Sequence, residues 1–413
     1  MLVTDFVVVG GGPAGVAAAI TLARAGREVV LVDKARFPRD KCCGDGLTAS
    51  ALRMLEELGL DPAEVASWHP VDDVVVRSPS GRETTFPLPR GQGQFAAVAR
   101  RADLDSAFLD VARKAGVDVR DGHAVTGVRQ DAERVTLAVE GVGELVAAYV
   151  VAADGMWSPV RKLAGAGTPG YLGEWHAFRQ YFTGVGERAS RELFVWFEPD
   201  LLPGYAWSFP LPDGGANVGF GIQRTGLRGP NANKSGKVER VQDMAKLWPQ
   251  LLERPHIRDT LGPGATPEGP HKAWPIPARV DQVSRATGRI LFVGDALAAT
   301  DAMTGEGIGQ ALLTGRLAAE SVLPAGPGEP GRATAAYDRA VDRALLADHK
   351  LSLLLIRALR HRKGARAALR VAGANAWTRR NFARWLFEDY PRAVVVTPQR
   401  WRRHLFTGPG AYS

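Results

Sequence analysis

The residues with the clearest chemistry form a glycine-rich segment near the N-terminus. It matches the pattern G-x-G-x-x-G and stands between an apolar stretch at 6–9 and an Ala-rich stretch at 13–25. Glycines at this spacing permit a tight turn and a close backbone approach to a pyrophosphate, and a helix starting there offers free N–H groups. A purely structural glycine turn is the alternative. We expect a dinucleotide to bind at Gly10, Gly12, Pro13, Ala14 and Gly15.

Acidic residues follow three further apolar stretches. Asp33 comes 18 residues after the last glycine of the motif, where a carboxylate can accept hydrogen bonds from ribose hydroxyls. Lys34 adjoins it and belongs to the same predicted cofactor site. Asp154 and Asp295 each come directly after an apolar stretch, the second of which ends in Gly294.

A cysteine-containing segment and an aromatic segment could also do chemistry. Residues 41–47 read Lys-Cys-Cys-Gly-Asp-Gly-Leu, and residues 203–210 read Pro-Gly-Tyr-Ala-Trp-Ser-Phe-Pro. In a strand, Tyr205, Trp207 and Phe209 would share one face, because successive side chains alternate. Such an aromatic wall suits a long apolar ligand that cannot form hydrogen bonds. The alternative is that these rings are ordinary sheet core.

The elements that must position these residues are of two kinds. The N-terminal third predicts strands alternating with helices, beginning with a strand–helix–strand unit at 6–32. From 165 to 276, strands rich in Phe, Trp, Tyr and Val dominate, with a Gly/Asn/Lys loop at 226–236. The predicted fold class is α/β. It comprises a discontinuous Rossmann-like dinucleotide-binding domain (1–70, 96–164 and 277–323), an antiparallel β-sheet substrate domain (71–95 and 165–276) and a C-terminal helical segment (331–413).

Composition excludes several classes of protein. The chain has 413 residues, of which 45% are hydrophobic and 23% charged, as in ordinary globular proteins. No apolar stretch approaches the ~20 residues that a spanning helix needs, and the N-terminus lacks the pattern of a signal peptide. The two cysteines, Cys42 and Cys43, exclude a disulfide-built scaffold and a Cys-rich zinc module and fit a reducing cytosol. We expect a cytoplasmic protein without a bound metal.

The positive charge is concentrated at the C-terminus. Residues 331–413 contain 17 Lys and Arg against 5 Asp and Glu, which is a net charge of +12. The whole chain has a net charge of +8, so the remaining residues together carry a net charge of −4. A basic helix with an apolar stripe can lie on an anionic membrane surface. It can equally pack on its own protein with a solvated Arg face. Nucleic-acid binding is not expected, because no recognised nucleic-acid module is present.

Three motifs together resemble the FAD-dependent oxidoreductases of the para-hydroxybenzoate hydroxylase type. These are the glycine-rich loop, the internal Asp154-Gly155 and the late Gly294-Asp295, in this order. The resemblance spans about residues 3–322 and implies that the dinucleotide is FAD, with Asp295 on its ribityl chain. It further implies that a helix N-terminus faces the flavin ring, where its dipole would stabilise the anionic reduced form. The other residues that it implies in FAD binding are Arg101, Gly305, Gly307 and Ile308.

Two segments narrow the resemblance to one family. The 41–47 loop resembles the Lys-Pro-Cys-Gly-x-Gly-Leu loop of geranylgeranyl reductases, and 203–210 resembles their Tyr-x-Trp-x-Phe-Pro motif. Members of this family saturate C=C bonds in prenyl chains. The resemblance implies that Cys43, Tyr205 and Trp207 are catalytic-site residues and that Cys43 and Gly44 lie at the cofactor. The chain departs from the family where Asp301-Ala302 replaces Asn-Pro, so we expect the active site to differ in shape from that of the family.

The leading hypothesis is a reductase that saturates a prenyl lipid or quinone by hydride transfer from reduced FAD. NAD(P)H is the expected reductant, although no second G-x-G-x-x-G unit provides a separate nicotinamide domain. Cys43, Asp45, Tyr205 and Glu306 are the candidate proton donors. The alternatives are a flavin-dependent monooxygenase or halogenase acting on an apolar or aromatic molecule, and a non-catalytic flavoprotein. Peripheral contact with the inner face of the membrane through residues 331–413 would bring the enzyme to a lipid substrate.

Overall fold

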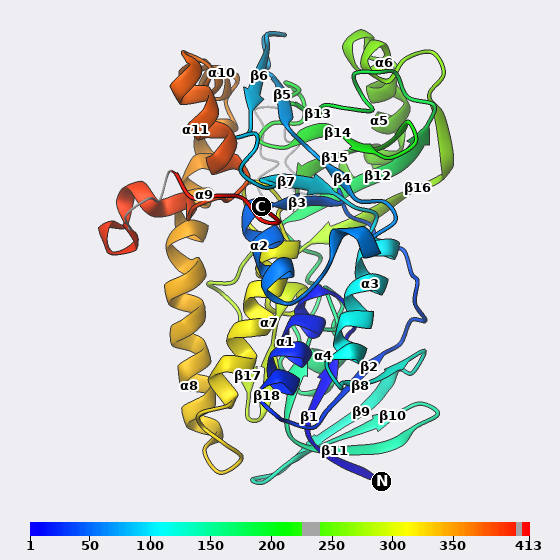
Figure 1. Ribbon diagram of the computed structural model, residues 1–413, viewed down its shortest axis with the longest axis vertical. Coiled ribbons are helices and arrows are strands. Elements are labelled where there is room, and N and C mark those ends of the chain that lie inside the picture. Colours follow the sequence, from blue (N-terminus) through cyan, green and yellow to red (C-terminus); the bar gives the residue numbers. More distant parts are fainter. Residues whose placement is uncertain (225–239, 402–406) are drawn as a thin grey trace, which may run out of the picture.

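A mainly parallel sheet carries the N-terminal motif in the computed structural model, which describes residues 1–224, 240–401 and 407–413 (Figure 1). Its strands lie in the order β17-β18-β11-β1-β2-β8, and the β9–β10 hairpin extends it through β11. Every pair from β18 to β8 is parallel. The bounds are β1 (Leu2–Val9), β2 (Val29–Asp33), β8 (Asp118–Asp121), β9 (Val125–Gln130), β10 (Val135–Val139), β11 (Gly143–Ala152), β17 (Ala286–Thr287) and β18 (Ile290–Phe292).

The central strands β1, β2, β11 and β18 contain continuous apolar runs because helices or loops cover both faces of the sheet there. Residues 6–9 of β1 are all buried, as are residues 150–152 of β11. Helix α1 begins at Pro13, whose missing N–H costs nothing at a first helical position. It packs between α3 and α7. The helices of this part are α1 (Pro13–Arg24), α2 (Ala49–Glu57), α3 (Arg101–Lys114), α4 (Pro159–Leu163) and α7 (Ile308–Val322).

A second, strongly twisted sheet forms the other half of the molecule (Figure 1). Its order is β16-β12-β15-β14-β13-β5-β6, antiparallel except for β5 beside β13. Helices α5 (Arg240–Leu252) and α6 (Pro255–Leu261) cover one face with residues such as Trp248. The bounds are β5 (Asp73–Arg77), β6 (Glu83–Pro87), β12 (Trp175–Thr183), β13 (Leu193–Trp196), β14 (Tyr205–Leu211), β15 (Gly215–Gln223) and β16 (Thr266–Ile276).

A small sheet connects the two halves, and its order is β3-β7-β4. The strands are β3 (Gly46–Thr48), β4 (His69–Pro70) and β7 (Ala96–Val98). Because β5 and β6 join the same sheet as β12 to β16, segment 71–95 lies with 165–276, although the division into domains stays a prediction. The loop expected at 226–236 lies outside the described residues. Single turns of helix occur at Pro62–Glu64, Gly294–Leu297, Arg392–Val396 and Pro398–Arg400.

The C-terminal segment packs along the whole molecule (Figure 1). Helix α8 (Pro330–Val341) continues through a π-helical turn (Asp342–Leu346) into α9 (Ala347–Leu359), and α10 (Arg362–Ala372) and α11 (Ala376–Leu386) follow. Helix α11 rests on β6, where the rings of Phe382 and Phe86 lie 4.8 Å apart. The basic helices pack on their own protein, and their contact with a membrane surface stays a prediction. Within the described ranges, no helix has both the length and the apolar character needed to cross a membrane.

Candidate active site

A cavity of about 900 Å³ lies where the two sheets and the C-terminal helices meet. Its lining includes every predicted site residue apart from Gly15. Residues that are far apart in the sequence therefore reach one space. In chain order they are Gly10, Gly12, Pro13, Ala14, Asp33, Lys34, Cys43, Gly44, Arg101, Asp154, Tyr205, Trp207, Gly294, Asp295, Gly305, Gly307 and Ile308.

The β1–α1 turn forms the dinucleotide end of the cavity. Gly10 has a φ of +111°, and a Cβ there would lie 2.3 Å from the Ala153 carbonyl oxygen. A Cβ on Gly15 would lie 1.8 Å from the Gly10 carbonyl oxygen, so Gly15 serves the close packing of α1 on β1 from beneath the cavity. Gly12 precedes α1 without a side-chain cap. The first N–H groups of α1 are thus available to an anion.

Asp33 is fixed at the end of β2 by two backbone N–H groups. Its Oδ2 accepts a hydrogen bond from the Gly11 N–H at 2.7 Å, and its Oδ1 accepts one from the Ala35 N–H at 2.8 Å. Each carboxylate oxygen keeps a lone pair, because an ionised carboxylate has about four acceptor positions. The carboxylate can therefore still accept hydrogen bonds from a ribose, as the sequence predicts, and Lys34 lines the cavity beside it.

Arg101 is buried at the start of α3 and forms a bidentate ion pair. Its Nε and Nη2 donate to the Asp105 carboxylate at 2.8 and 2.7 Å. Arg39 approaches the same carboxylate at 2.9 Å. Arg101 is only 5% exposed, so this ion pair is not a surface salt bridge. Two guanidinium groups around one carboxylate leave this part of the cavity positively charged and suited to a pyrophosphate.

The late motif places a charged pair and a helix start beside the cavity. Asp295 accepts a hydrogen bond from Lys41 Nζ at 2.8 Å. Burial disfavours the ionised carboxylate, but the Lys41 ammonium outweighs it and lowers the pKa of Asp295. Helix α7 begins next to this pair, with Gly307 as its N-cap and Gly305 at a φ of +73°.

Asp154 forms its hydrogen bonds within its own loop. Its Oδ1 accepts a hydrogen bond from the Ser158 hydroxyl at 2.5 Å, and its Oδ2 accepts one from the Val160 N–H at 2.8 Å. Burial raises the pKa of Asp154. Its contact with a cofactor stays a prediction, and the contacts present show a carboxyl that holds the start of α4 against the cavity wall.

The cysteine loop is fastened to the second sheet through its backbone. The Cys43 carbonyl accepts hydrogen bonds from Asn217 Nδ2 at 2.9 Å and from Arg179 Nε at 3.3 Å. The Cys43 sulfur accepts the Asp45 N–H at 3.3 Å. Burial raises the pKa of the Cys43 thiol and raises that of Cys42 to about 12, so both sulfurs stay protonated.

Asp45 is fully buried on a left-handed backbone with a φ of +64°. Its Oδ2 accepts hydrogen bonds from the Tyr181 hydroxyl at 2.6 Å and from Asn217 Nδ2 at 2.8 Å. Its Oδ1 is inaccessible to water and has no hydrogen-bond partner among the described residues. Burial raises the pKa of Asp45 to about 6, against the opposing charge of Arg179.

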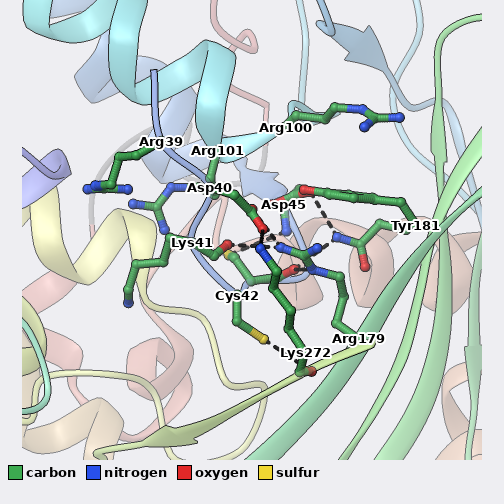
Figure 2. A network of polar contacts seen from close by, with 12 residues as sticks. Arg39, Asp40, Lys41, Cys42, Asp45, Arg100, Arg101, Arg179, Tyr181 and Lys272 are labelled. Atoms are coloured by element: carbon green, nitrogen blue, oxygen red, sulfur yellow. Dashed lines mark hydrogen bonds and ion pairs between the residues drawn. The ribbon is translucent and has the colours of Figure 1, made fainter. Parts of the chain in front are cut away.

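Arg179 lies at the centre of the polar network beneath the loop (Figure 2). Its Nη2 donates to Asp40 at 2.8 Å and to the Lys41 carbonyl at 3.1 Å, and its guanidinium stacks over the Tyr181 ring at 4.0 Å. Asp40 also pairs with Lys272 at 2.5 Å. Arg179 is 2% exposed, so it anchors the loop rather than binding a solvated ligand.

The aromatic strand β14 forms one wall of the cavity. Tyr205, Trp207 and Phe209 all line it, so these rings are not merely sheet core. The Tyr205 hydroxyl donates to the Thr304 carbonyl, and Trp207 Nε1 donates to Asn217 Oδ1 at 3.0 Å. Apolar side chains of α9 to α11 and the turn after α11 close the opposite side, among them Leu355, Leu359, Leu369, Phe382, Trp385, Leu386 and Phe387.

Sequence reasoning missed the residues that hold the site together. Arg39 and Arg179 belong to no motif, and the sequence predicts Asn217 only as the start of the Asn-Val-Gly strand that follows the aromatic motif of the family. Only the pairing of β12 with β15 brings Arg179 and Asn217 to the cysteine loop. A weak signal existed, because an Arg and an Asn within otherwise apolar strands must be paired when they are buried. Helices α9 to α11, which close the cavity opposite β14, are indicated in the sequence only by their stripe of apolar residues.

The residues present fit FAD. In the described part of the chain, a Cβ on Gly12 would meet within 4 Å only Arg39 Nη2 at 3.5 Å and Arg101 Nη2 at 3.9 Å, so the β1–α1 turn is open beside two guanidinium groups. The N-terminus of α1 is uncapped, and Asp33 retains acceptor capacity. The cavity then continues past Asp295 and the start of α7 to the aromatic wall, as an extended dinucleotide with a terminal ring requires.

Comparisons with known proteins agree with this geometry. Residues 3–191 match the FAD binding domain family. The chain is 34% identical to a menaquinone reductase of Mycolicibacterium smegmatis over 78% of this chain and 77% of that protein. It is 30% identical to a digeranylgeranylglycerophospholipid reductase of Methanopyrus kandleri over 78% of this chain and 80% of that protein.

The fold resembles that of solved structures. A geranylgeranyl bacteriochlorophyll reductase-like protein of Thermoplasma acidophilum superimposes with a TM-score of 0.77 at 20% identity, and the match covers 97% of this chain and all of that one. The predicted α/β fold and the predicted cofactor FAD are confirmed. With its relatives at 30% identity or more over most of its length, the chain belongs to the geranylgeranyl reductase family of FAD-dependent oxidoreductases.

Proposed function

We propose that this oxidoreductase saturates a C=C bond in the isoprenoid chain of a lipid or quinone. The observation that carries the proposal is the continuity of the cavity, which runs from the FAD-binding turn to an aromatic wall and an apolar helical roof. An isoprenoid chain offers no hydrogen-bonding groups, so a site for it must consist of apolar surface. The names of the relatives from Mycolicibacterium and Methanopyrus support the same substrate class.

The chain's own residues would bind the substrate and exclude water. When bound, reduced FAD supplies a hydride from its ring. Tyr205 and Trp207 are held by hydrogen bonds to Thr304 and Asn217, so the wall that would orient an alkene is preorganised. The apolar side chains of α10 and α11 would keep the reacting carbons dry.

A single anaerobic experiment tests the proposed function. The FAD-loaded protein is reduced with dithionite and mixed with menaquinone or with a geranylgeranylated glycerolipid. We expect a product that has gained two hydrogens, together with reoxidation of the flavin. A product that forms only when oxygen is admitted, and that carries an added oxygen or halogen atom, would overturn the proposal in favour of a monooxygenase or halogenase.

We propose NAD(P)H as the reductant, bound transiently near the flavin. The sequence has a single G-x-G-x-x-G unit, which belongs to FAD, so NAD(P)H would bind at the FAD cavity and not in a domain of its own. Anaerobic bleaching of the flavin by NADPH or NADH, accelerated by substrate, is the expected result. A flavin that neither nucleotide reduces, but that dithionite reduces, would exclude this reductant. Persistent failure of every reductant would point instead to a non-catalytic flavoprotein.

We further propose that the C-terminal helices contact an anionic membrane surface. Val371, Trp377 and Trp401 are 64–70% exposed, which is unusual for large apolar side chains, and Arg366 and Arg370 are exposed on the same segment. Apolar side chains among basic ones suit the headgroup region, where each Lys or Arg adds about 1 kcal/mol. The same helices roof the cavity, so contact there would bring a membrane lipid to the site.

Vesicle binding tests the membrane proposal. The variant Arg366→Glu with Arg370→Glu should sediment with phosphatidylglycerol vesicles at least tenfold more weakly than wild type, and phosphatidylcholine vesicles should bind neither. Arg27→Glu with Arg134→Glu is the matched control, because it changes the charge equally on two exposed residues. They lie between α1 and β2 and between β9 and β10, and the β9–β10 hairpin is at the opposite end of the molecule from α10 (Figure 1). Equal weakening by both variants would mean that only net charge matters, and this outcome would overturn a specific surface.

A further inference from the structure

Saturation of an alkene needs a proton as well as a hydride. The inference below rests on the proposed function, in which the hydride comes from the reduced flavin and the protein supplies the proton to the second carbon. The cavity lining includes four side chains that could carry that proton, namely Cys43, Asp45, Tyr205 and Glu306. Their burial and hydrogen bonds show which of the four can release a proton into the cavity.

Three of the four groups are poorly placed to release a proton into the cavity. Asp45 is fully buried, and its unpartnered Oδ1 has no accessible surface. The Tyr205 hydroxyl already donates its hydrogen to the Thr304 carbonyl, and burial raises its pKa far above neutrality. Burial also raises the pKa of the Cys43 thiol, whose conjugate thiolate would be left in an apolar space.

Glu306 differs in position and in accessibility. It lies between Gly305 and the start of α7, on the loop that borders the cavity, and its side chain is only partly buried. Its Oε1 accepts the Gly309 N–H at 2.6 Å, which orients the carboxyl. Its Oε2 has no hydrogen-bond partner among the residues that the structure describes. One oxygen is therefore anchored and the other is available to carry a proton.

The surrounding charges keep Glu306 neutral. Arg392 donates to Glu388 from Nη2 at 2.9 Å and from Nε at 3.2 Å, and it lies 3.5 Å from Asp301. Asp301 and Glu388 share the charge of Arg392, and Glu306 makes no such hydrogen bond. Burial raises the pKa of Glu388, although Arg392 opposes this. Burial, reinforced by the negative charge of Glu388, raises the pKa of Glu306 to about 8, and Arg392 only partly offsets this. The Tyr205 hydroxyl faces the same space and is uncharged.

We propose that Glu306 is the proton donor in the saturation of the C=C bond. As one alkene carbon receives the hydride, the O–H bond of Glu306 breaks, its electron pair stays on the carboxylate, and a C–H bond forms on the other carbon. The carboxylate left behind is stabilised by the Gly309 N–H at the N-terminus of α7 and by Arg392. Solvent returns the proton between turnovers.

The variant Glu306→Gln tests this role, because glutamine can still accept the Gly309 N–H. We expect the FAD-loaded variant to retain its flavin content and its rate of anaerobic flavin reduction. Reoxidation of its reduced flavin by the alkene should slow about 100-fold, a typical loss for a general acid. Glu320→Gln is the matched control, because this exposed glutamate lies near the end of α7 and outside the cavity, and it should slow this step less than threefold. Wild-type reoxidation rates in Glu306→Gln, or an equal loss in Glu320→Gln, would overturn the assignment.

The pH dependence supplies a readout that a structural role would not produce. The wild-type reoxidation rate should be level below about pH 8 and fall above it, because only the protonated acid reacts. This fall should be absent in Glu306→Gln and should begin at lower pH in Glu388→Gln, where the neighbouring negative charge is gone. An unchanged profile in both variants would overturn the proposal.

A spectroscopic measurement keeps the donor assignment separate from the function itself. In the oxidised holoprotein, the infrared band of a protonated carboxyl should disappear near pH 8 in wild type and be missing in Glu306→Gln. If that band is present but wild type reduces no alkene, the proposed function fails. If wild type reduces the alkene but the band does not depend on Glu306, the donor assignment fails.

Discussion

The Asp45 carboxyl shows how one residue can combine strain, burial and charge. It occupies a left-handed backbone conformation that an aspartate tolerates better than most residues, and its side chain is fully buried. Two donors satisfy Oδ2, whereas Oδ1 has none among the described groups. A carboxyl in that situation favours its neutral form, because desolvation penalises the charge.

The free energy of unfolding should therefore depend on pH through the titration of Asp45. The pKa of Asp45 is about 6 when folded and about 4 when unfolded, so the folded state binds the extra proton. Its contribution is therefore present at about pH 4, is lost as the pH rises towards 6, and stays level above that. Relative to Asp45→Asn, the free energy of unfolding of wild type should fall by roughly 2–3 kcal/mol between pH 4 and pH 7.

Urea unfolding at both pH values measures this difference. Asp213→Asn is the matched control, since Asp213 also has a left-handed backbone, with a φ of 59°, but is exposed to solvent. Its difference from wild type should not change with pH. Parallel pH profiles for wild type and Asp45→Asn would show that Asp45 titrates normally.

At the scale of elements, Arg392 joins the C-terminal segment to the loop at the start of α7. Its Nη2 donates to the Thr304 hydroxyl at 3.0 Å, and its guanidinium pairs with Glu388 and approaches Asp301. Asp301 also accepts the Ser352 hydroxyl of α9 at 2.7 Å. The Asp301-Ala302 departure from the family motif thus lies where the loop is tied to the C-terminal helices.

Removing this guanidinium should leave the buried carboxyl groups of Asp301 and Glu388 without the positive charge that they contact. We expect Arg392→Met to lower the free energy of unfolding by about 3–5 kcal/mol, as removal of one member of a buried ion pair does. Adding Glu388→Gln should recover part of this loss, because it removes one uncompensated charge. A double-mutant cycle by urea unfolding measures the coupling. Strictly additive losses would show that the two side chains do not act together.

At the scale of the whole molecule, the C-terminal segment belongs to the core. Ala333, Tyr337 and Val341 of α8 are buried in the same cluster as β1 and α1, and the Tyr337 hydroxyl donates to the Phe292 carbonyl at 2.8 Å. Deletion of residues 331–413 should therefore abolish cooperative unfolding and retention of FAD. Near-ultraviolet circular dichroism and flavin content after gel filtration measure both. A truncated chain that stays yellow and folded would show that the segment is an appendage.

Much of the fold follows from local sequence. The glycine motif at Gly10 to Gly15 and the apolar run of β1 predict the dinucleotide-binding turn, because close backbone approach requires glycine and a buried parallel strand requires apolar residues. The alternation of Tyr205, Trp207 and Phe209 predicts a shared face, because strand geometry is local. Both features depend on neighbours only a few residues away.

What the tertiary structure alone decided is which distant side chains share a space. The sequence gives no spacing rule that pairs Asn217 with Asp45, or Arg392 with Asp301, because those contacts depend on how sheets and helices pack. The proposed assignment of the proton to Glu306 rests on the same packing, because the residue type does not show which carboxyl groups border the cavity. The inward packing of the basic helices α9 to α11 likewise depends on the tertiary structure, because their apolar side chains pack around a cavity that distant parts of the chain form together.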